Sequence, residues 1–517
     1  MDKNRGDKAP TLRKPGHGGF SRRWVLALAV ALVVVLALVI GLNVGGLREE
    51  ILWRINPPRI ESIAVLPLKN LSHDPGQDNL AAAMTVALTD DLQRMEAIRV
   101  VAGQSVAPYR KAPKPPPEIG QELNIDAVVK GGVLRSGDRV RLAADLIHAP
   151  TNRRLWGRTL ERDLSEVLRL SADISSALTL EITGKLAPQQ EASLSGLRAV
   201  NPQAYEAYME SFSGDPANRE ASLKRAVELD PMFARAYDMT AGMYYMRNMF
   251  TEAGYVLPPR DAFPAAREAA QKAVSLDPTL SPSHRILGSV ALEYDWDFVA
   301  AEKEFKRAIE LAPNGPVAHH MYAHFLLSMG RMEEARAESR HAMDVDPRRR
   351  TLIACVSFHD IAEGSYDEAE KHALQALSLG VPDQLARLTL GWSYALRGRH
   401  DEAIAEFQKA VVGWQNAVFP TAALGHAYAV AGQEPAAREV LDKLIVRSKN
   451  EYVSPYEIAV IYAGLGDKDR AFEWLEKALG ERSTMLVYFR MDPRIWSLRS
   501  DARFQDLLRR MNFPQKQ

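Results

Sequence analysis

Five glycines in the second half of the chain recur at a constant interval of 34 residues. Within each interval, apolar residues have the spacing of two amphipathic helices. The glycine ends the first helix of a pair, and a proline such as Pro313 or Pro347 follows the second helix. Small residues recur where two paired helices must cross closely. This period predicts an α-solenoid, in which stacked helix pairs share one continuous core.

The glycine ladder consists of Gly330, Gly364, Gly398, Gly432 and Gly466. The small-residue ladders consist of Ala301, Ala335, Ala369, Ala403, Ala437 and Ala471, and of Ala308, Ala342, Ala376, Ala410 and Ala478, with Leu444 on the missing rung. A 34-residue period of helix pairs identifies tetratricopeptide repeats. Weaker copies of the second helix end at Pro231 and Pro278 and extend the array toward the N-terminus. We expect about eight repeats over residues 197–492, and then a capping helix and tail over 493–517.

Residues 60–187 have a different pattern, which predicts a small α/β domain. An apolar strand at Ser62–Leu68 precedes a helix over Asn79–Met95, and a short strand follows at Ile98–Ala102. Two alternating segments flank Ser136-Gly137-Asp138, which is the signature of a β-hairpin. A helix from about Leu164 to Leu186 closes the domain. The loop after the first strand lacks a glycine-rich phosphate cradle, so we interpret it as a structural turn.

The segments IAVLPLKNLSHDP, IRVVAGQS and IGQELNIDAVVKGGVLRSGDRVRLAADLIHAPTNRRLWGRTLERDL occur here in that order. In this arrangement the region resembles the TolB amino-terminal-like domain of bacterial signalling proteins. The resemblance implies a domain that follows a transmembrane helix and precedes tetratricopeptide repeats. The chain departs from that family at Leu68, where phenylalanine is usual, and at Leu80–Val86, where an acidic and glycine-containing run is usual.

The N-terminal segment contains an uncharged apolar run at Trp24–Leu42, which continues without charge to Leu47. A helix of about 20 apolar residues can cross a membrane. Seven Lys and Arg residues precede the run, and three follow it closely. The positive-inside rule then predicts a disordered cytoplasmic tail over 1–23, a transmembrane helix over 24–47, and a periplasmic remainder at the inner membrane. A cleaved signal and a buried helix of a soluble domain are the alternatives.

The first helices of the repeats are expected to line a concave groove. By resemblance to tetratricopeptide repeats, one register position of these helices points into it, and a second lies four residues earlier. The resulting groove is aromatic, aliphatic and histidine-bearing, which is suited to an apolar or aromatic peptide segment of another protein. The alternative is that these side chains pack within and between the repeats. The candidate groove residues are His320, His324, Phe358, Leu388, Trp392, His426 and Tyr456.

Other chemistry has little support. His320 and His324 lie four residues apart, but no glutamate stands between them as in a zincin, and no cysteine is near them in the sequence. The single cysteine, Cys355, lies in an apolar run and is interpreted as a small buried residue. Lys and Arg number 65, as do Asp and Glu, so charge gives no indication of nucleic-acid binding. We therefore expect no enzyme activity, cofactor or metal site.

The expected fold class is thus a multidomain chain of one transmembrane helix, a small α/β domain and an α-solenoid. The expected function is a membrane-anchored scaffold or sensor that binds another protein through its repeat groove. The alternative is a sensor subunit of a signalling or transcription-regulating system whose DNA-binding or cyclase output lies on another polypeptide.

Overall fold

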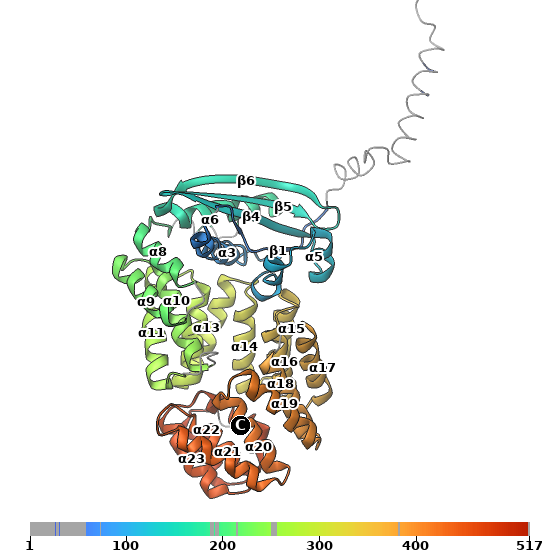
Figure 1. The fold of residues 1–517 in the computed structure, drawn as a ribbon, viewed down its shortest axis with the longest axis vertical. Coiled ribbons are helices and arrows are strands. Elements are labelled where there is room, and N and C mark those ends of the chain that lie inside the picture. The colour runs from blue at the N-terminus through green and yellow to red at the C-terminus, as the bar shows by residue number, and fades with distance from the viewer. Residues whose placement is uncertain are drawn as a thin grey trace, which may run out of the picture. The chain divides into compact units, whose positions relative to one another are not determined.

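The computed structural model describes residues 58–72, 74–186, 196–212, 216–249, 256–380 and 383–514, together with the single positions 26, 30 and 191. The chain divides into two units, Met1–Arg59 and Ile60–Gln517. All elements described below belong to the second unit (Figure 1).

The fold class predicted from the sequence must be corrected for its transmembrane helix. Among the described residues, no helix is both long enough and apolar enough to cross a membrane. The longest of these helices, α11 (Pro259–Leu276), has 18 residues and carries charged side chains, whereas a membrane span needs about 20 predominantly apolar residues. The predicted tail over 1–23 and the predicted span over 24–47 lie outside the described residues, apart from positions 26 and 30. The fold is a mostly helical solenoid with a small N-terminal sheet region.

The sheet region contains six strands in one sheet, in the order β3-β1-β4-β5-β6, with β2 beside β4. Strand β1 is parallel to both β3 and β4, whereas β4, β5 and β6 are antiparallel. The predicted hairpin forms between β4 and β5, and Gly137 at its turn has a φ of 60°. The strands are β1 (Ser62–Val65), β2 (Lys69–Asn70), β3 (Arg99–Val101), β4 (Ala127–Ser136), β5 (Arg139–His148) and β6 (Arg153–Asp163).

Helices cover both faces of this sheet because the strands β1 and β4 carry buried side chains on both sides. Helices α3 (Asp78–Leu92) and α6 (Val167–Thr183) bury one face, which includes Ile63 and Val129. Helices α4 (Pro108–Lys111) and α5 (Pro116–Leu123) lie against the other face, which includes Ala64.

The described residues between 202 and 480 contain eight consecutive helix pairs, and the 34-residue period predicts about eight. The first helices are α8 (Pro202–Glu210), α10 (Ala234–Met249), α12 (Ser281–Val290), α14 (Pro316–Ser328), α16 (Arg350–Glu363), α18 (Gln384–Leu396), α20 (Val418–Val430) and α22 (Pro455–Gly464). The second helices are α9 (Pro216–Leu229), α11, α13 (Phe298–Leu311), α15 (Met332–Val345), α17 (Tyr366–Ser378), α19 (His400–Gly413), α21 (Glu434–Arg447) and α23 (Lys468–Gly480).

The ladders have the local roles that the sequence predicts. All five ladder glycines have φ between 75° and 83° and stand one or two positions after the end of a first helix. This conformation costs other residues roughly 1–2 kcal/mol. The ladder alanines and Leu444 are buried, each with at most 1% of the side chain's surface exposed. Their small size lets the paired helices approach closely.

The sheet region and the first helix pairs share one hydrophobic core. A single cluster of buried side chains runs from Ile63 and Met84 to Tyr205 and Phe233. Polar contacts add to it: Arg235 of α10 lies 3.0 Å from Asp91 of α3, and Arg99 of β3 donates a hydrogen bond of 3.1 Å to the backbone carbonyl of Asp344. The sheet region is therefore part of the same folded unit as the repeats.

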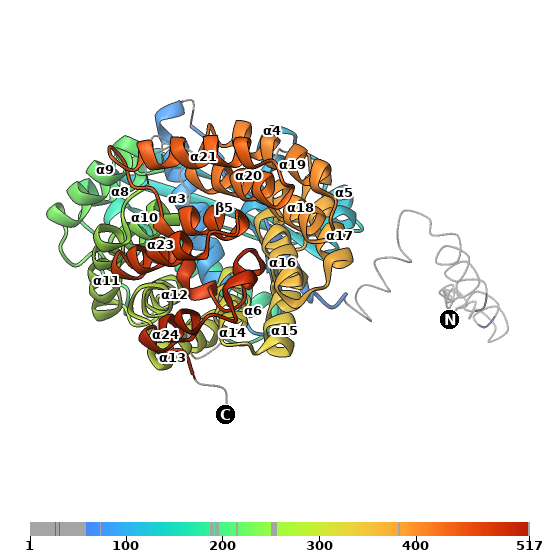
Figure 2. The same ribbon diagram turned by 90° about the horizontal axis from the view of Figure 1, so that it is seen from below.

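The helix pairs wind around a common axis, and we call this winding the ring. Figure 2 shows it from below, and Figure 1 shows the last pairs, α20 to α23, lying below the first ones. The ring brings the C-terminal helices back to the earlier pairs: Arg482 donates a 3.0 Å hydrogen bond to the carbonyl of Tyr294, and Phe513 packs on Phe298 with ring centroids 5.0 Å apart. After the last pair, the chain forms 3-10 helices at Thr484–Tyr488 and Pro493–Leu498, followed by α24 (Ala502–Arg510). Arg510 of α24 forms an ion pair of 2.7 Å with Glu476 of α23.

Candidate functional site: the inner face of the ring

The seven residues predicted to line the groove lie on alternate helices, from α14 to α22, and we call them the inner face. Neighbouring members touch along the ring. The rings of His324 and Phe358 have centroids 6.4 Å apart, and those of Phe358 and Trp392 are 6.1 Å apart at an interplanar angle of 60°. The indole of Trp392 also packs on Phe419, at 5.7 Å. A continuous aromatic stripe therefore follows the first helices.

A segment of the same chain, residues 484–498, lies against the inner face, and we call it the C-terminal segment. Its Tyr488 packs edge-to-face on Phe358, with ring centroids 5.6 Å apart, and its hydroxyl lies 3.0 Å from Nδ1 of His324. Farther along, the guanidinium of Arg494 lies 5.2 Å from the ring centroid of Trp392. Asp492 accepts a 2.8 Å hydrogen bond from the hydroxyl of Tyr456.

The inner face is consequently buried rather than open. Only 5% of the Trp392 side chain is exposed, and Tyr456 and Leu388 are fully buried. His320 and His426 are also buried, while His324 and Phe358 are part-exposed. Within the C-terminal segment itself, apolar side chains such as Leu486 and Ile495 are fully buried. The C-terminal segment of the same chain therefore covers this face.

Arg494 lies between two buried acidic side chains at this contact. Its guanidinium lies 2.8 Å from Asp492 and 3.0 Å from Glu457, and all three side chains are buried. Burial raises the pKa of Glu457, whereas for Asp492 the opposing effect of burial is outweighed by Arg494, and its pKa lies below the usual range. Oε1 of Glu457 has no hydrogen-bond partner among the described residues.

Burial also sets the charge of the inner-face histidines. Burial, together with the nearby charge of Arg494, lowers the pKa of His426 to about 4. Burial lowers the pKa of His324 to about 4 as well, and it holds the pKa of His320 well below its ordinary value. At neutral pH these three imidazoles are uncharged, so they offer the inner face hydrogen-bonding nitrogens without positive charge.

Sequence reasoning missed the residues that face this stripe. Tyr488 and Arg494 lie outside the 34-residue ladder, and the periodicity therefore gives them no position. A signal was nevertheless present, since VYFRMDPRIW combines aromatic, acidic and basic residues directly after the last repeat. Cys355 was interpreted as a small buried residue from its apolar run. Its neighbours in space, His320 and His324, lie in the preceding repeat and could not be inferred from that run.

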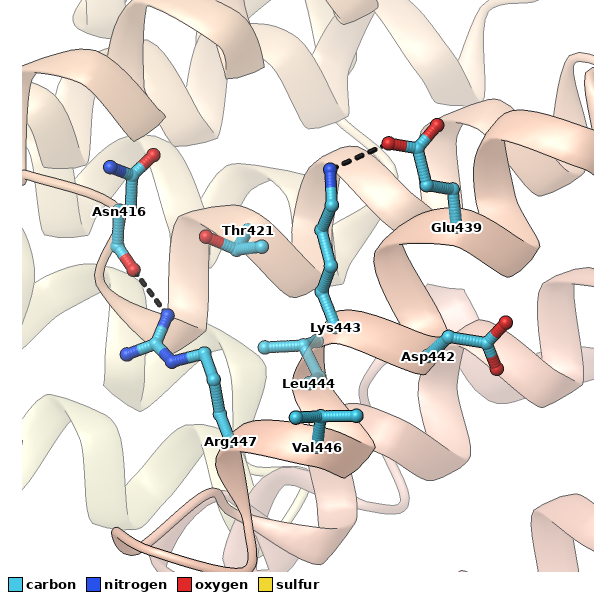
Figure 3. Close-up of a pocket in the computed structure, with 8 residues that line it drawn as sticks. All are labelled: Asn416, Thr421, Glu439, Asp442, Lys443, Leu444, Val446 and Arg447. Carbon is cyan, nitrogen blue, oxygen red and sulfur yellow. Dashed lines mark hydrogen bonds and ion pairs between the residues drawn. The ribbon is translucent and has the colours of Figure 1, made fainter.

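A second surface feature is a hollow of about 560 Å³ along α20 and α21 (Figure 3). Lys443 and Glu439 form an ion pair of 2.6 Å at its rim, and Arg447 donates a 2.6 Å hydrogen bond to the backbone carbonyl of Asn416. These charges are neutralised within the hollow itself. Its lining side chains offer no unusual reactivity, and the inner face remains the stronger candidate.

Models of the tetratricopeptide repeat family match residues 304–337, 360–418, 418–443 and 456–484 of this chain. These matches confirm the tetratricopeptide repeats that the sequence predicts. Such repeats generally bind protein partners.

A curated protein of Rhizobium meliloti (strain 1021), named "Putative adenylate cyclase 3", is 28% identical over 193 residues, which are 35% of this chain. The match covers 32% of that protein, so the chain spans about a third of the length of the curated relative. Among solved structures, the APC/C hetero-tetramer Cut9-Hcn1 is similar with a TM-score of 0.40 and 15% identity, over 66% of this chain and 62% of that one. A tetratricopeptide repeat protein of Parabacteroides merdae ATCC 43184 gives a TM-score of 0.35 and 15% identity, over 54% of this chain and 99% of that one.

Proposed function

We propose that this chain is a protein-interaction scaffold whose inner face recognises a peptide segment, and that the C-terminal segment occupies this face in cis. The supporting observation is the pairing of Tyr488 with His324 and Phe358, and of Arg494 with Trp392. The inner face accepts a tyrosine hydroxyl at its histidine end and an arginine guanidinium at its tryptophan end. It therefore selects peptides by the type of these two side chains and by the spacing between them.

The contacts of the C-terminal segment define the peptide that the inner face would accept. Tyr488, Asp492 and Arg494 form the pattern Tyr-x-x-x-Asp-x-Arg. The tyrosine reaches the histidine end of the stripe, and the arginine reaches the tryptophan end with its charge balanced by the aspartate. A partner protein with this pattern would compete with the C-terminal segment for the same face.

The test compares peptide binding by the inner face with and without the two anchoring side chains of the chain's own C-terminal segment. A labelled peptide of residues 482–499 is titrated, with fluorescence anisotropy as the readout, into the unaltered chain and into the double variant Tyr488→Ala/Arg494→Ala. We expect binding to the double variant alone, because its own segment has lost both anchors. A peptide with the same two substitutions serves as the control. Adding Trp392→Ala to the double variant should weaken binding by about 30-fold or more, as for an aromatic hot spot.

Two outcomes would reject the proposal. One is a double variant that keeps its helical circular dichroism and yet does not bind the peptide. The other is a double variant that unfolds, since the segment would then be an obligatory part of the core and not an exchangeable ligand.

The match to a protein named as an adenylate cyclase supports a second candidate function, a regulatory module of a signalling system. The resemblance of residues 60–187 to the TolB amino-terminal-like domain points the same way. On this proposal the output activity lies on another polypeptide. Purified chain incubated with ATP should then form no cyclic AMP, and affinity-purified complexes should contain a cyclase or a transcription regulator. Cyclic AMP formation by the purified chain would reject it.

A further inference from the structure

Three histidines and the single cysteine of the chain gather at one point between two neighbouring first helices. His320 and His324 lie four residues apart on α14, and Cys355 and His359 lie four residues apart on α16. Residues at this spacing share one face of a helix. Ligand atoms of His320, His324 and Cys355 all lie within 4.8 Å of one another. Nε2 of His359 lies 3.3 Å from Nδ1 of His324.

The cluster contains a buried polar atom whose role is otherwise unexplained. Nδ1 of His320 has no hydrogen-bond partner among the described residues, although only 9% of this residue is exposed. Buried polar groups in folded proteins are almost always paired, so this nitrogen, beside a second imidazole and a thiol, is available to bind a ligand. Packing alone would be satisfied by an apolar side chain at this position.

Neighbouring side chains hold the other members of the cluster in place. The hydroxyl of Ser339 lies 2.7 Å from Nδ1 of His359, and the hydroxyl of Tyr488 lies 3.0 Å from Nδ1 of His324. Hydrogen bonds of this kind orient the imidazoles of metal sites from behind and fix their tautomers. Part of the surface of His324 and Cys355 is exposed, so the cluster is accessible from outside.

The protonation states suit metal binding by nitrogen. Burial lowers the pKa of His320, His324 and His359, and all three imidazoles are therefore neutral at physiological pH. Burial raises the pKa of Cys355 to about 12, so the thiol is protonated until a metal ion displaces its proton. The acidic Asp383 adds to this rise, while Arg349 opposes it and favours the thiolate once it has formed.

We propose that His320, His324 and Cys355 bind one thiophilic metal ion, Zn²⁺ or Cu⁺, and that His359 positions His324 from behind through its contact with Nδ1. The donor set of two imidazoles and one sulfur selects such ions. Binding breaks the S–H bond, forms an S–metal bond and releases one proton to solvent. None of these three donors is a carboxylate oxygen, which hard cations such as Mg²⁺ and Ca²⁺ need.

The distances allow this assignment after small side-chain rotations. Donor atoms around a tetrahedral zinc ion lie roughly 3.3–3.8 Å from one another, given metal–nitrogen distances of about 2.0 Å and metal–sulfur distances of about 2.3 Å. The three donors here lie within 4.8 Å of one another, which is a somewhat wider arrangement of the same kind.

The test uses the reduced, chelator-treated 517-residue chain. Zn²⁺ is titrated in competition with a chromophoric zinc chelator, and Cu⁺ is titrated without oxygen in competition with a Cu⁺-specific chelator. We expect one ion per chain in at least one arm and the release of one proton per Zn²⁺ or Cu⁺ bound. Cys355→Ser and His320→Ala should each weaken binding by about 100-fold or more, at or beyond the upper range for an orienting residue, and His359→Ala should weaken it less.

His319→Gln is the matched control. His319 adjoins His320 in the sequence, but its ring nitrogens lie 2.6 Å from Glu338 and 2.9 Å from the carbonyl of Pro313, outside the cluster. Circular dichroism melts identify variants that have lost their fold. Co²⁺ gives an independent readout, since a thiolate ligand produces a sulfur-to-metal charge-transfer band that Cys355→Ser should abolish.

The proposal is overturned if the folded chain binds neither ion at unit stoichiometry. It is also overturned if His319→Gln weakens binding as much as Cys355→Ser does, or if the Co²⁺ complex lacks the charge-transfer band.

Discussion

The hydroxyl of Tyr488 lies 3.0 Å from Nδ1 of His324, although the two residues are 164 positions apart in the chain. This contact joins the C-terminal segment to the fourth helix pair. It also places the C-terminal segment, which follows the last repeat, inside the ring. There Tyr488 packs on Phe358, and Arg494 lies over Trp392 of the aromatic stripe.

Tyr488→Phe should lower the free energy of unfolding by about 0.5–1.5 kcal/mol, because it removes one buried hydrogen bond and leaves the ring contacts intact. Urea unfolding followed by circular dichroism measures the change. Tyr428→Phe is the control, since the hydroxyl of Tyr428 accepts its 3.1 Å hydrogen bond from Gln408 at an exposed position. Equal effects of the two substitutions would show that the Tyr488 hydroxyl has no special role.

Arg494→Met should be far more disruptive than removal of an exposed arginine. It leaves Asp492 and Glu457 buried without their cation, and breaking a buried ion pair in this way costs about 3–5 kcal/mol. Thermal unfolding is the measurement, with Arg503→Met as the exposed control, for which we expect little change. Replacing the two acids as well, by Asn and Gln, should restore most of the lost stability. Failure of this rescue would mean that packing of the Arg494 side chain, and not its charge, stabilises the site.

Gly398→Ala should lower the free energy of unfolding by about 1 kcal/mol through backbone strain alone. Gly398 has a φ of 77°, and an added Cβ would have no heavy atom within 4 Å, so no steric clash contributes. Gly480→Ala is the matched control, because Gly480 ends α23 with equally open surroundings and without a positive φ. We expect the control to be neutral or stabilising. A neutral Gly398→Ala variant would contradict the left-handed conformation at this position.

His426 should give the protein a defined acid sensitivity. Its pKa in the fold is about 4, below the unfolded value of about 6.5. The unfolded state therefore binds the proton more readily than the fold between these values, and stability is lost as the pH falls through this window. Relative to His426→Phe, the unaltered chain should lose about 1.4 kcal/mol per pH unit between pH 6.5 and 4. Urea midpoints of both proteins across this range measure it, and a difference that stays constant with pH would contradict the prediction.

The sequence determined the local structure of the repeats because that structure depends on residues close together in the chain. The glycine at each 34-residue interval ends a first helix through its own backbone conformation. A small residue such as Ala410 lets the two helices of its own pair cross closely. The same register placed Phe358 and Trp392 on one stripe. Membrane spanning was predicted from local hydropathy at residues 24–47, outside the described part of the chain, and the described helices do not support it.

What covers the stripe was decided only by the tertiary structure. The ring must turn through all its helix pairs before Tyr488 meets His324, and no period in the sequence encodes that closure. The same reason applies to Cys355, which meets His320 and His324 only because consecutive first helices stack side by side. Periodicity determines which face of a helix a residue occupies, whereas the accumulated curvature of the repeats determines which distant residue it meets.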